Sequence, residues 1–220
     1  MLPEEVDWLG ERLPPGSGRG RVVLNIGSST RHYRTVMQPN IDRAIFRPLT
    51  ERGYKVLHID RKLDEGVDLV GDLEDAAFAK QLATLHPELV FCNNVLMHLR
   101  PGGLSSVIAA INDIVPMGSL LFVSGSAVYP HTSDPHDNGL RVDEVKLARL
   151  FAGFDVVESA IVTSRRSLLG DLLEDKRLAG KVALRALLPF YRPRNWLELI
   201  RYLPKIRTPY AAACAILRKR

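Results

Sequence analysis

The chain has 220 residues, of which 46% are hydrophobic and 25% are charged, and these proportions are typical of a soluble globular protein. No stretch approaches the roughly 18 apolar residues that a membrane-spanning helix needs, and the acidic N-terminal segment lacks the pattern of a secretory signal, so we expect a cytoplasmic protein. Residues 1–162 carry a net charge of −5, from 16 Lys and Arg against 21 Asp and Glu, whereas residues 163–220 carry +10, from 14 against 4.

Helix and strand patterns alternate along most of the chain. Apolar residues share one face of an expected helix at 4–13, and a linker rich in proline and glycine follows, so residues 1–20 are expected to precede the main domain. Short apolar strands separated by helices then predict a parallel sheet with helices on both faces. The expected strands are 21–26, 54–60, 67–70, 88–93, 118–124 and 154–162, and the clearest helices between them are 74–85, 103–115 and 142–151.

The first expected strand ends at a glycine, and two later strands end at acids. Gly27 permits a tight turn in which the backbone can approach a ligand closely. Asp60 ends the second expected strand, where a carboxylate can accept hydrogen bonds from ribose hydroxyls. Asp72 follows the third expected strand at the same edge of the sheet. Together the three residues predict a site for an adenosine-containing ligand.

The turn after Gly27 distinguishes between adenosine-containing ligands. A dinucleotide site needs further glycines that cradle a pyrophosphate, but this chain has Ser28 and Ser29 there. Asp60 also lies 33 residues after Gly27, against about 20 in a dinucleotide-binding unit. The pattern therefore favours a ligand without a pyrophosphate, and S-adenosylmethionine fits.

Four segments resemble motifs of the class I S-adenosylmethionine-dependent methyltransferases, and more narrowly of the small enzymes that accompany bacterial surface-glycan biosynthesis. These segments are VLNIGSS at 23–29, HID at 58–60, VDLVGDL at 67–73 and NNVLMHL at 93–99. The resemblance implies a Rossmann-like α/β fold, with a mostly parallel seven-stranded sheet, an antiparallel last strand and helices on both faces. It also implies that the donor, S-adenosyl-L-methionine, is bound by Gly27, Ser28, Asp60, Asp72, Leu73 and Asn94.

Two positions depart from the family pattern. Asn25 stands where the family usually has an acid, and Met97 stands where it often has a glutamate. A degenerate methyltransferase domain that binds a partner without turnover is therefore an alternative to an active enzyme. A second alternative is an NAD-dependent nucleotide-sugar epimerase or reductase, because residues 121–129 are similar to the fifth strand of those enzymes. However, this chain lacks the pyrophosphate-binding turn of those enzymes, and it has Ser133 where their catalytic lysine is expected.

The resemblance also places the last strand in the apolar run 210–217, so residues 163–208 become an insertion in a methyltransferase domain that spans 21–220. Helical periodicity covers 168–188, and a second amphipathic stretch ends near Ile206. The basic residues of the insertion alternate with Leu, Trp, Tyr and Phe, as in helices that lie on an anionic membrane surface. A helical lid that packs on the domain is the alternative, and nucleic-acid binding is the least favoured interpretation.

Methyl transfer from a sulfonium requires alignment of donor and acceptor more than it requires a nucleophile on the protein. A hydroxyl acceptor, which we expect on a glycan or an acidic small molecule, would benefit from a general base. The candidates are His98, after the fourth expected strand, and His131, in the loop after the fifth. Arg31 and Arg34 are candidates to bind an acidic acceptor. For the loop after the fifth expected strand there are two alternatives. It is a solvated connection, or it forms a metal site from His131, Asp134, His136 and Asp137.

Overall fold

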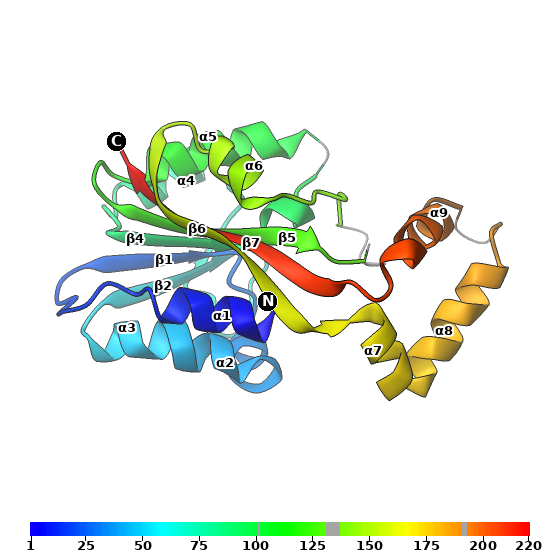
Figure 1. Cartoon of the computed structure of the whole chain (residues 1–220). Helices are drawn as coiled ribbons and strands as arrows, with labels where there is room; N and C mark the ends of the chain where they lie inside the picture. The colour runs from blue at the N-terminus through cyan, green and yellow to red at the C-terminus, as the bar shows by residue number, and fades with distance from the viewer. Residues whose placement is uncertain (101, 131–136, 191–192) are drawn as a thin grey trace.

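The structure of the protein is a computed structural model that describes residues 1–100, 102–130, 137–190 and 193–220, without the side chains of residues 194 and 195. Its seven strands form one sheet in the order β3-β2-β1-β4-β5-β7-β6 (Figure 1). Strand β7 runs antiparallel to β5 and β6, and the remaining pairs are parallel, so the predicted Rossmann-like sheet with an antiparallel last strand is confirmed. The strands are β1 (Val22–Ile26), β2 (Lys55–Asp60), β3 (Leu69–Val70), β4 (Leu89–Asn93), β5 (Leu120–Val128), β6 (Phe154–Ser167) and β7 (Pro209–Lys219).

Helices cover both faces of the sheet (Figure 1). Successive residues of a strand point to opposite faces, so Val23 and Phe91 belong to one hydrophobic core and Leu24 and Cys92 to the other. The first face is covered by α1 (Pro3–Gly10), η1 (Tyr33–Met37), α2 (Pro39–Ile41), η2 (Asp42–Phe46) and α3 (Arg47–Glu51). The second face is covered by α4 (Ala76–Ala83), α5 (Gly103–Ile114) and α6 (Glu144–Arg149).

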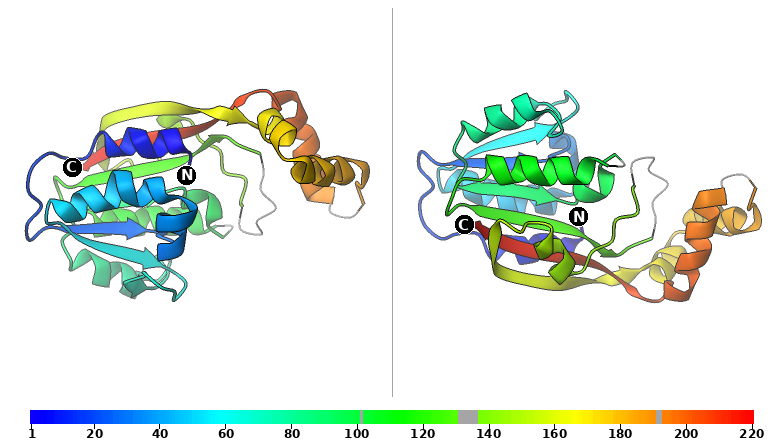
Figure 2. Two further views of the ribbon diagram at one scale, coloured as in Figure 1. Left: turned by 90° about the horizontal axis from the view of Figure 1, so that it is seen from below. Right: turned by 90° about the horizontal axis from the view of Figure 1, so that it is seen from above.

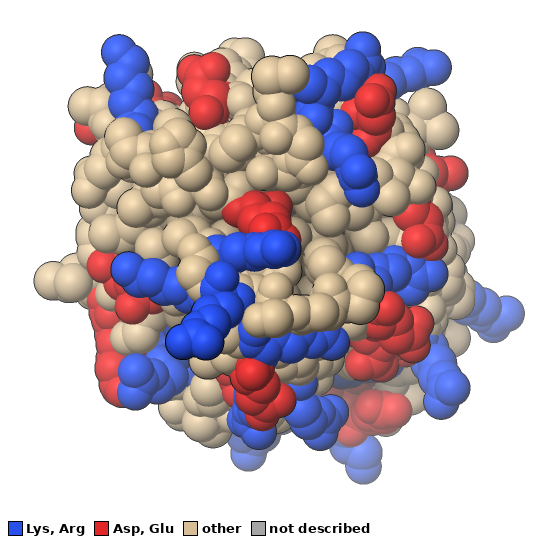
Figure 3. Space-filling model, turned by 90° about the vertical axis from the view of Figure 1, so that its left-hand side faces the viewer, with Lys and Arg blue, Asp and Glu red and all other residues tan. Residues whose placement is uncertain are grey.

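Strands β1, β2, β4 and β5 end at one edge of the sheet. Backbone pairing aligns Ile26 with Ile59 and Cys92, and it aligns Asn93 with Ser124. The turns after these strands, including the short turn η3 (Leu96–His98), therefore meet at this carboxyl edge. The opposite side of the molecule, where the strands begin, carries basic and acidic side chains interspersed with one another (Figure 3).

Residues 163–208 project from the domain beyond the carboxyl edge of the sheet (Figures 1 and 2). Strand β6 continues to Ser167, past the expected end at residue 162, and its pairing with β7 carries the helices away from the core. Among the described residues, no helix is long and apolar enough to cross a membrane. The helices of the insertion are α7 (Leu168–Glu174), α8 (Lys176–Leu187), α9 (Pro193–Tyr202) and η4 (Leu203–Lys205).

The periodic stretch 168–188 contains two helices and not one. The side chain of Asp175 accepts hydrogen bonds from the backbone N–H groups of Arg177 and Leu178, so it caps the start of α8. At the base of the insertion, Leu168, Tyr202 and Tyr210 form a small separate hydrophobic cluster. The outer helices are tied to each other by the Trp196 indole, which donates to the Ala186 carbonyl at 2.8 Å.

Candidate functional site

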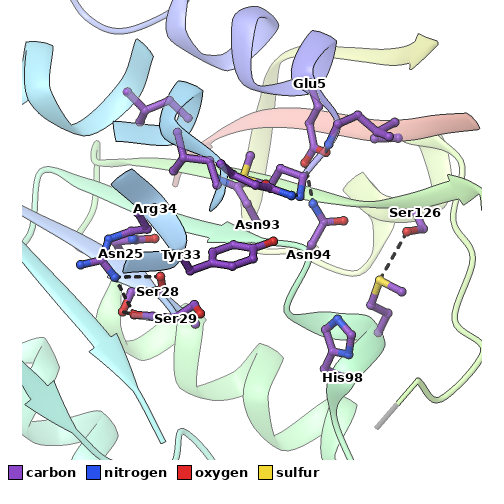
Figure 4. A pocket seen from close by; sticks show the side chains of 18 of the residues that line it. Glu5, Asn25, Ser28, Ser29, Tyr33, Arg34, Asn93, Asn94, His98 and Ser126 are labelled. Carbon is purple, nitrogen blue, oxygen red and sulfur yellow. Dashed lines mark hydrogen bonds between the residues drawn. The ribbon is translucent and has the colours of Figure 1, made fainter. Parts of the chain in front are cut away.

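Two adjoining cavities lie at the carboxyl edge of the sheet. The larger has a volume of about 590 Å³ and lies among the ends of β1, β4 and β5 and helix α1. The smaller, of about 180 Å³, lies beside the end of β2 and the turn after β3. Both cavities are lined by Gly27, Arg61, Asn94 and His98, so these residues form a common wall. Figure 4 shows the side chains around the larger cavity. This edge is where open α/β sheets bind ligands.

The turn after β1 brings backbone close to both cavities. Gly27 has a φ of 67°, and a Cβ atom there would lie 2.4 Å from Cγ2 of Val95, so any other residue would have to displace that side chain. Ser29 and Asn94 adopt φ angles of 55° and 56° although both carry side chains. The left-handed backbone is unstrained at Gly27 but strained at Ser29 and Asn94, and the surrounding contacts must hold those two residues in place.

Arg34 holds this turn in position. Its guanidinium donates to the carbonyls of Ser28 at 2.9 Å, Ser29 at 2.5 Å and Gly66 at 2.7 Å, which links the turn after β1 to the loop after β2. The side chain is buried, and burial lowers the pKa of Arg34. These bonds give Arg34 a positioning role at the turn, and the residue also lines the larger cavity.

Both acids that the sequence places at strand ends line the smaller cavity, together with Leu73. Asp60 Oδ2 accepts a hydrogen bond from the backbone N–H of Ser29 at 2.8 Å. Asp72 Oδ2 accepts one from the Arg100 guanidinium at 3.2 Å. Each carboxylate oxygen has two lone pairs, so both acids can accept further bonds from the hydroxyl or amine groups of a ligand.

Neutral amides line the larger cavity. Asn93 Oδ1 is buried and is without a hydrogen-bond partner in the part of the chain that the structure describes. Asn25 Nδ2 lies 3.0 Å from His58 Nδ1, and because an amide NH₂ can only donate, the imidazole nitrogen accepts and the ring is neutral. Burial, with the like charge of Arg34 in addition, lowers the pKa of His58 to about 4, in agreement with a neutral ring.

Glu5 enters the larger cavity from helix α1 (Figure 4). The residue is only 1% exposed, and its Oε1 accepts hydrogen bonds from Asn94 Nδ2 at 2.7 Å and from Ser124 Oγ at 2.5 Å. Glu5 is not among the site residues that the sequence motifs indicate. One signal was present, since Glu5 lies one turn before Leu9 on the apolar face of the expected helix, where an unpaired acid is costly.

His98, one of the two candidate bases predicted from the sequence, lines both cavities. His131, the other candidate, lies outside the described residues, as does the rest of the segment 131–136. Asp137 is described, and its carboxylate forms an ion pair with Arg141 at 2.9 Å. Within the described ranges, no group of three or more His, Cys, Asp and Glu side chains is placed to hold a metal ion.

No protein family model matches the sequence, and no curated protein matches it. Solved structures do share its fold. A SAM-dependent methyltransferase from Archaeoglobus fulgidus has 16% identity and a TM-score of 0.56, over 97% of this chain and 94% of that chain. Coclaurine N-methyltransferase, solved with N-methylheliamine and SAH, has 11% identity and a TM-score of 0.57, over 97% and 69%.

A third protein with the same fold is named for a different reaction, a [4+2] cyclisation. The cyclase SpnF has 17% identity and a TM-score of 0.57, over 99% of this chain and 80% of that chain. At such identities the similarity establishes the fold, and the function must be argued from the site. The chain therefore has the Rossmann-like fold of class I methyltransferases.

Proposed function

We propose that the protein binds S-adenosylmethionine in the two adjoining cavities and transfers its methyl group to a hydroxyl of a glycan or an acidic small molecule. The observation that carries this proposal is the juxtaposition of Asp60 and Asp72 in one cavity with the Gly27 turn and a second, larger cavity beside it. The fold shared with the Archaeoglobus methyltransferase and with coclaurine N-methyltransferase supports it.

The residues present suit an adenosine-containing donor. Asp60 would accept the ribose hydroxyls, because its carboxylate ends β2 at the cavity wall. Asp72 and Leu73 would bind the base in the same cavity. Ser28, Gly27 and Asn94 would hold the part of the donor that passes into the larger cavity. The donor, when bound, supplies an electrophilic methyl group, so the protein itself needs to align the acceptor and exclude water.

The acceptor would lie in the larger cavity, near the wall that it shares with the smaller one. His98 lines that wall, and it would take the proton of an acceptor hydroxyl as the oxygen–methyl bond forms and the methyl–sulfur bond breaks, with S-adenosylhomocysteine as the leaving group. His131 is retained as a proposed second candidate for this base. Arg61 also lines both cavities, and its positive charge suits an acidic acceptor.

A domain that binds the donor without turnover is the second candidate function. One observation favours it: at Met97, where the family often has a glutamate, the thioether sulfur accepts a hydrogen bond from Ser126 Oγ at 3.3 Å. At this position, therefore, the described part of the cavity wall has a thioether and not a carboxylate. The reductase alternative has less support, because the turn after β1 has Ser28 and Ser29 where a pyrophosphate would need glycines, and the Arg34 guanidinium donates to the Ser28 carbonyl of this turn.

A labelling experiment tests methyl transfer. Purified protein is incubated with S-adenosylmethionine that carries a tritiated methyl group, together with glycan and acidic small-molecule fractions from cells. We expect label on an acceptor hydroxyl. The variant His98→Gln should lower the rate about 100-fold through loss of the base, with donor affinity unchanged. An unchanged rate would remove His98 from catalysis, and absence of label in every fraction would favour the non-catalytic domain.

We also propose that the insertion 163–208 contacts an anionic membrane surface. It contains 11 Lys and Arg against 4 Asp and Glu. No residue of α8 is buried, and apolar side chains are exposed beside the charges, with Leu187 77% and Phe190 96% exposed. Exposed apolar side chains among basic ones match a surface of anionic lipid headgroups. Because the insertion lies beyond the edge that holds the cavities, a membrane-bound acceptor could reach them (Figure 2).

A further inference from the structure

Glu5 is a buried carboxylate to which the residues described by the structure offer no cationic partner. All its described hydrogen-bond donors are neutral: the Asn94 amide, the Ser124 hydroxyl and the backbone N–H of Leu2, which donates to Oε2 at 2.9 Å. None of the ion pairs found among the described residues includes Glu5. Burial of an uncompensated charge is costly, so a carboxylate kept at such a position points to a cation that it binds.

The carboxylate of Glu5 faces the larger cavity and not the solvent. Helix α1 is fixed there by Val6 and Leu9, which are fully buried in the core beneath it, so the position of Glu5 is set by packing. Tyr33 lines the same cavity, and its pKa is raised by burial and by the negative charge of Glu5. The negative charge of Glu5 therefore acts within the larger cavity. Asp60 lines the smaller cavity, and Gly27 lines both.

The position of Glu5 relative to the acids of the smaller cavity suggests which part of a donor it would meet. Asp60 and Asp72 lie in the smaller cavity, which suits the nucleoside. Asn94 lines both cavities and donates its side-chain N–H to Glu5. A donor with its nucleoside beside Asp60 would extend past Asn94, and its amino-acid end would then lie in the cavity that Glu5 lines.

We propose that Glu5 is the anionic subsite for the ammonium group at the amino-acid end of the donor. Strand β1 offers no acid for this purpose, because Asn25 occupies that position and its amide is bonded to His58. The carboxylate is supplied by α1, a helix that precedes the sheet in the chain. This inference rests on the proposed function.

Calorimetric titration with three ligands tests the subsite. S-adenosylmethionine and S-adenosylhomocysteine carry the ammonium group, and methylthioadenosine has the same nucleoside without the amino acid. The variant Glu5→Gln should bind the first two about 10-fold more weakly and methylthioadenosine within about twofold of the wild type, because only the charge-assisted bond is lost. Glu4→Gln is the matched control: it removes the same charge from α1, at a residue that bonds the Arg165 N–H and is outside the cavity.

The outcomes separate the subsite from a structural role and from the proposed function. Equal loss of all three ligands in Glu5→Gln would mean that the residue only supports the fold of the site, and it would overturn the inference. Unchanged affinity for S-adenosylmethionine, or a lower methylation rate with intact donor binding, would overturn it as well. If the wild type binds none of the three ligands, the proposed function itself fails, and the inference fails with it.

Discussion

Gly27 is required for two independent physical reasons. Its φ of 67° is strained for any residue with a side chain, and a Cβ would meet Val95 at 2.4 Å. Gly118 shares only the first of these, since its φ is 80° but a Cβ there would have no atom within 4 Å. Substitution of each glycine by alanine therefore separates the cost of the left-handed backbone, which both share, from the steric effect on the site, which only Gly27 has.

The substitution Gly27→Ala should abolish donor binding, whereas Gly118→Ala should leave it intact. Both variants should lose about 1 kcal/mol of stability from the left-handed backbone. Only the first forces a shift of the Val95 side chain, which lines the smaller cavity. Chemical denaturation and calorimetric titration measure the two effects. Donor binding by Gly27→Ala at wild-type affinity would contradict the placement of the donor beside this turn.

His58 makes the stability of the protein depend on pH. Its pKa in the folded protein is about 4, lowered by burial, whereas the unfolded value is about 6.5, so the unfolded state binds the proton more readily. The stabilisation is complete above pH 6.5 and is lost as the pH falls towards 4. Between pH 7 and pH 5 the wild type should lose about 2 kcal/mol more than His58→Gln. Urea denaturation of both proteins measures this, and parallel losses would contradict a buried neutral His58.

The residues of the site differ in how far the sequence predicts them. Asp60 and Asp72 were predictable because each follows a strand-like run, and parallel strands end at a common edge. Glu5 could be noticed only as an acid on the apolar face of its helix, and its role could not be predicted, because its partners Asn94 and Ser124 lie 89 and 119 positions away along the chain. A local pattern contains no information about such contacts.

At the scale of elements, helix boundaries were harder to predict than the elements themselves. The apolar periodicity of 168–188 is continuous, but the side chain of Asp175 caps a new helix at Lys176. A capping residue in the middle of a periodic stretch competes with continuation of the helix, and periodicity alone does not decide between them. Strand β6 is likewise extended to Ser167 by its pairing with β7, which is a long-range contact.

The exposed surface of α8 gives the insertion a testable property. The double variant Lys181→Glu and Arg185→Glu should weaken binding to vesicles of phosphatidylcholine and phosphatidylglycerol by at least about 2 kcal/mol, because each basic residue near an anionic surface contributes about 1 kcal/mol. Its matched control, Arg19→Glu and Arg43→Glu, changes the net charge equally at exposed positions outside the insertion.

Co-sedimentation with these vesicles, and with vesicles of phosphatidylcholine alone, measures the binding. The control variant should bind like the wild type, and neither protein should bind strongly to the neutral vesicles. If both double variants bound anionic vesicles equally weakly, binding would depend on the overall charge of the protein and not on α8. No binding of the wild type to anionic vesicles would contradict the proposed membrane contact.

At the scale of the whole molecule, the alternation of strands and helices, together with the family resemblance, predicted the seven-stranded sheet and its antiparallel last strand. The direction of the insertion was not predictable, because it depends on how far β6 and β7 remain paired beyond the core (Figure 1). The resulting molecule has its cavities and its basic insertion towards one end, and it has mixed charges at the other end (Figure 3).

Calorimetric titration of the purified protein with S-adenosylmethionine and, in parallel, with NADH tests the central claim most directly. The two acids of the smaller cavity and the turn without a pyrophosphate cradle predict saturable binding of S-adenosylmethionine alone. Binding of NADH alone would contradict the account and favour a reductase. Binding of neither ligand would also contradict it, and the fold would then serve a different function in this protein.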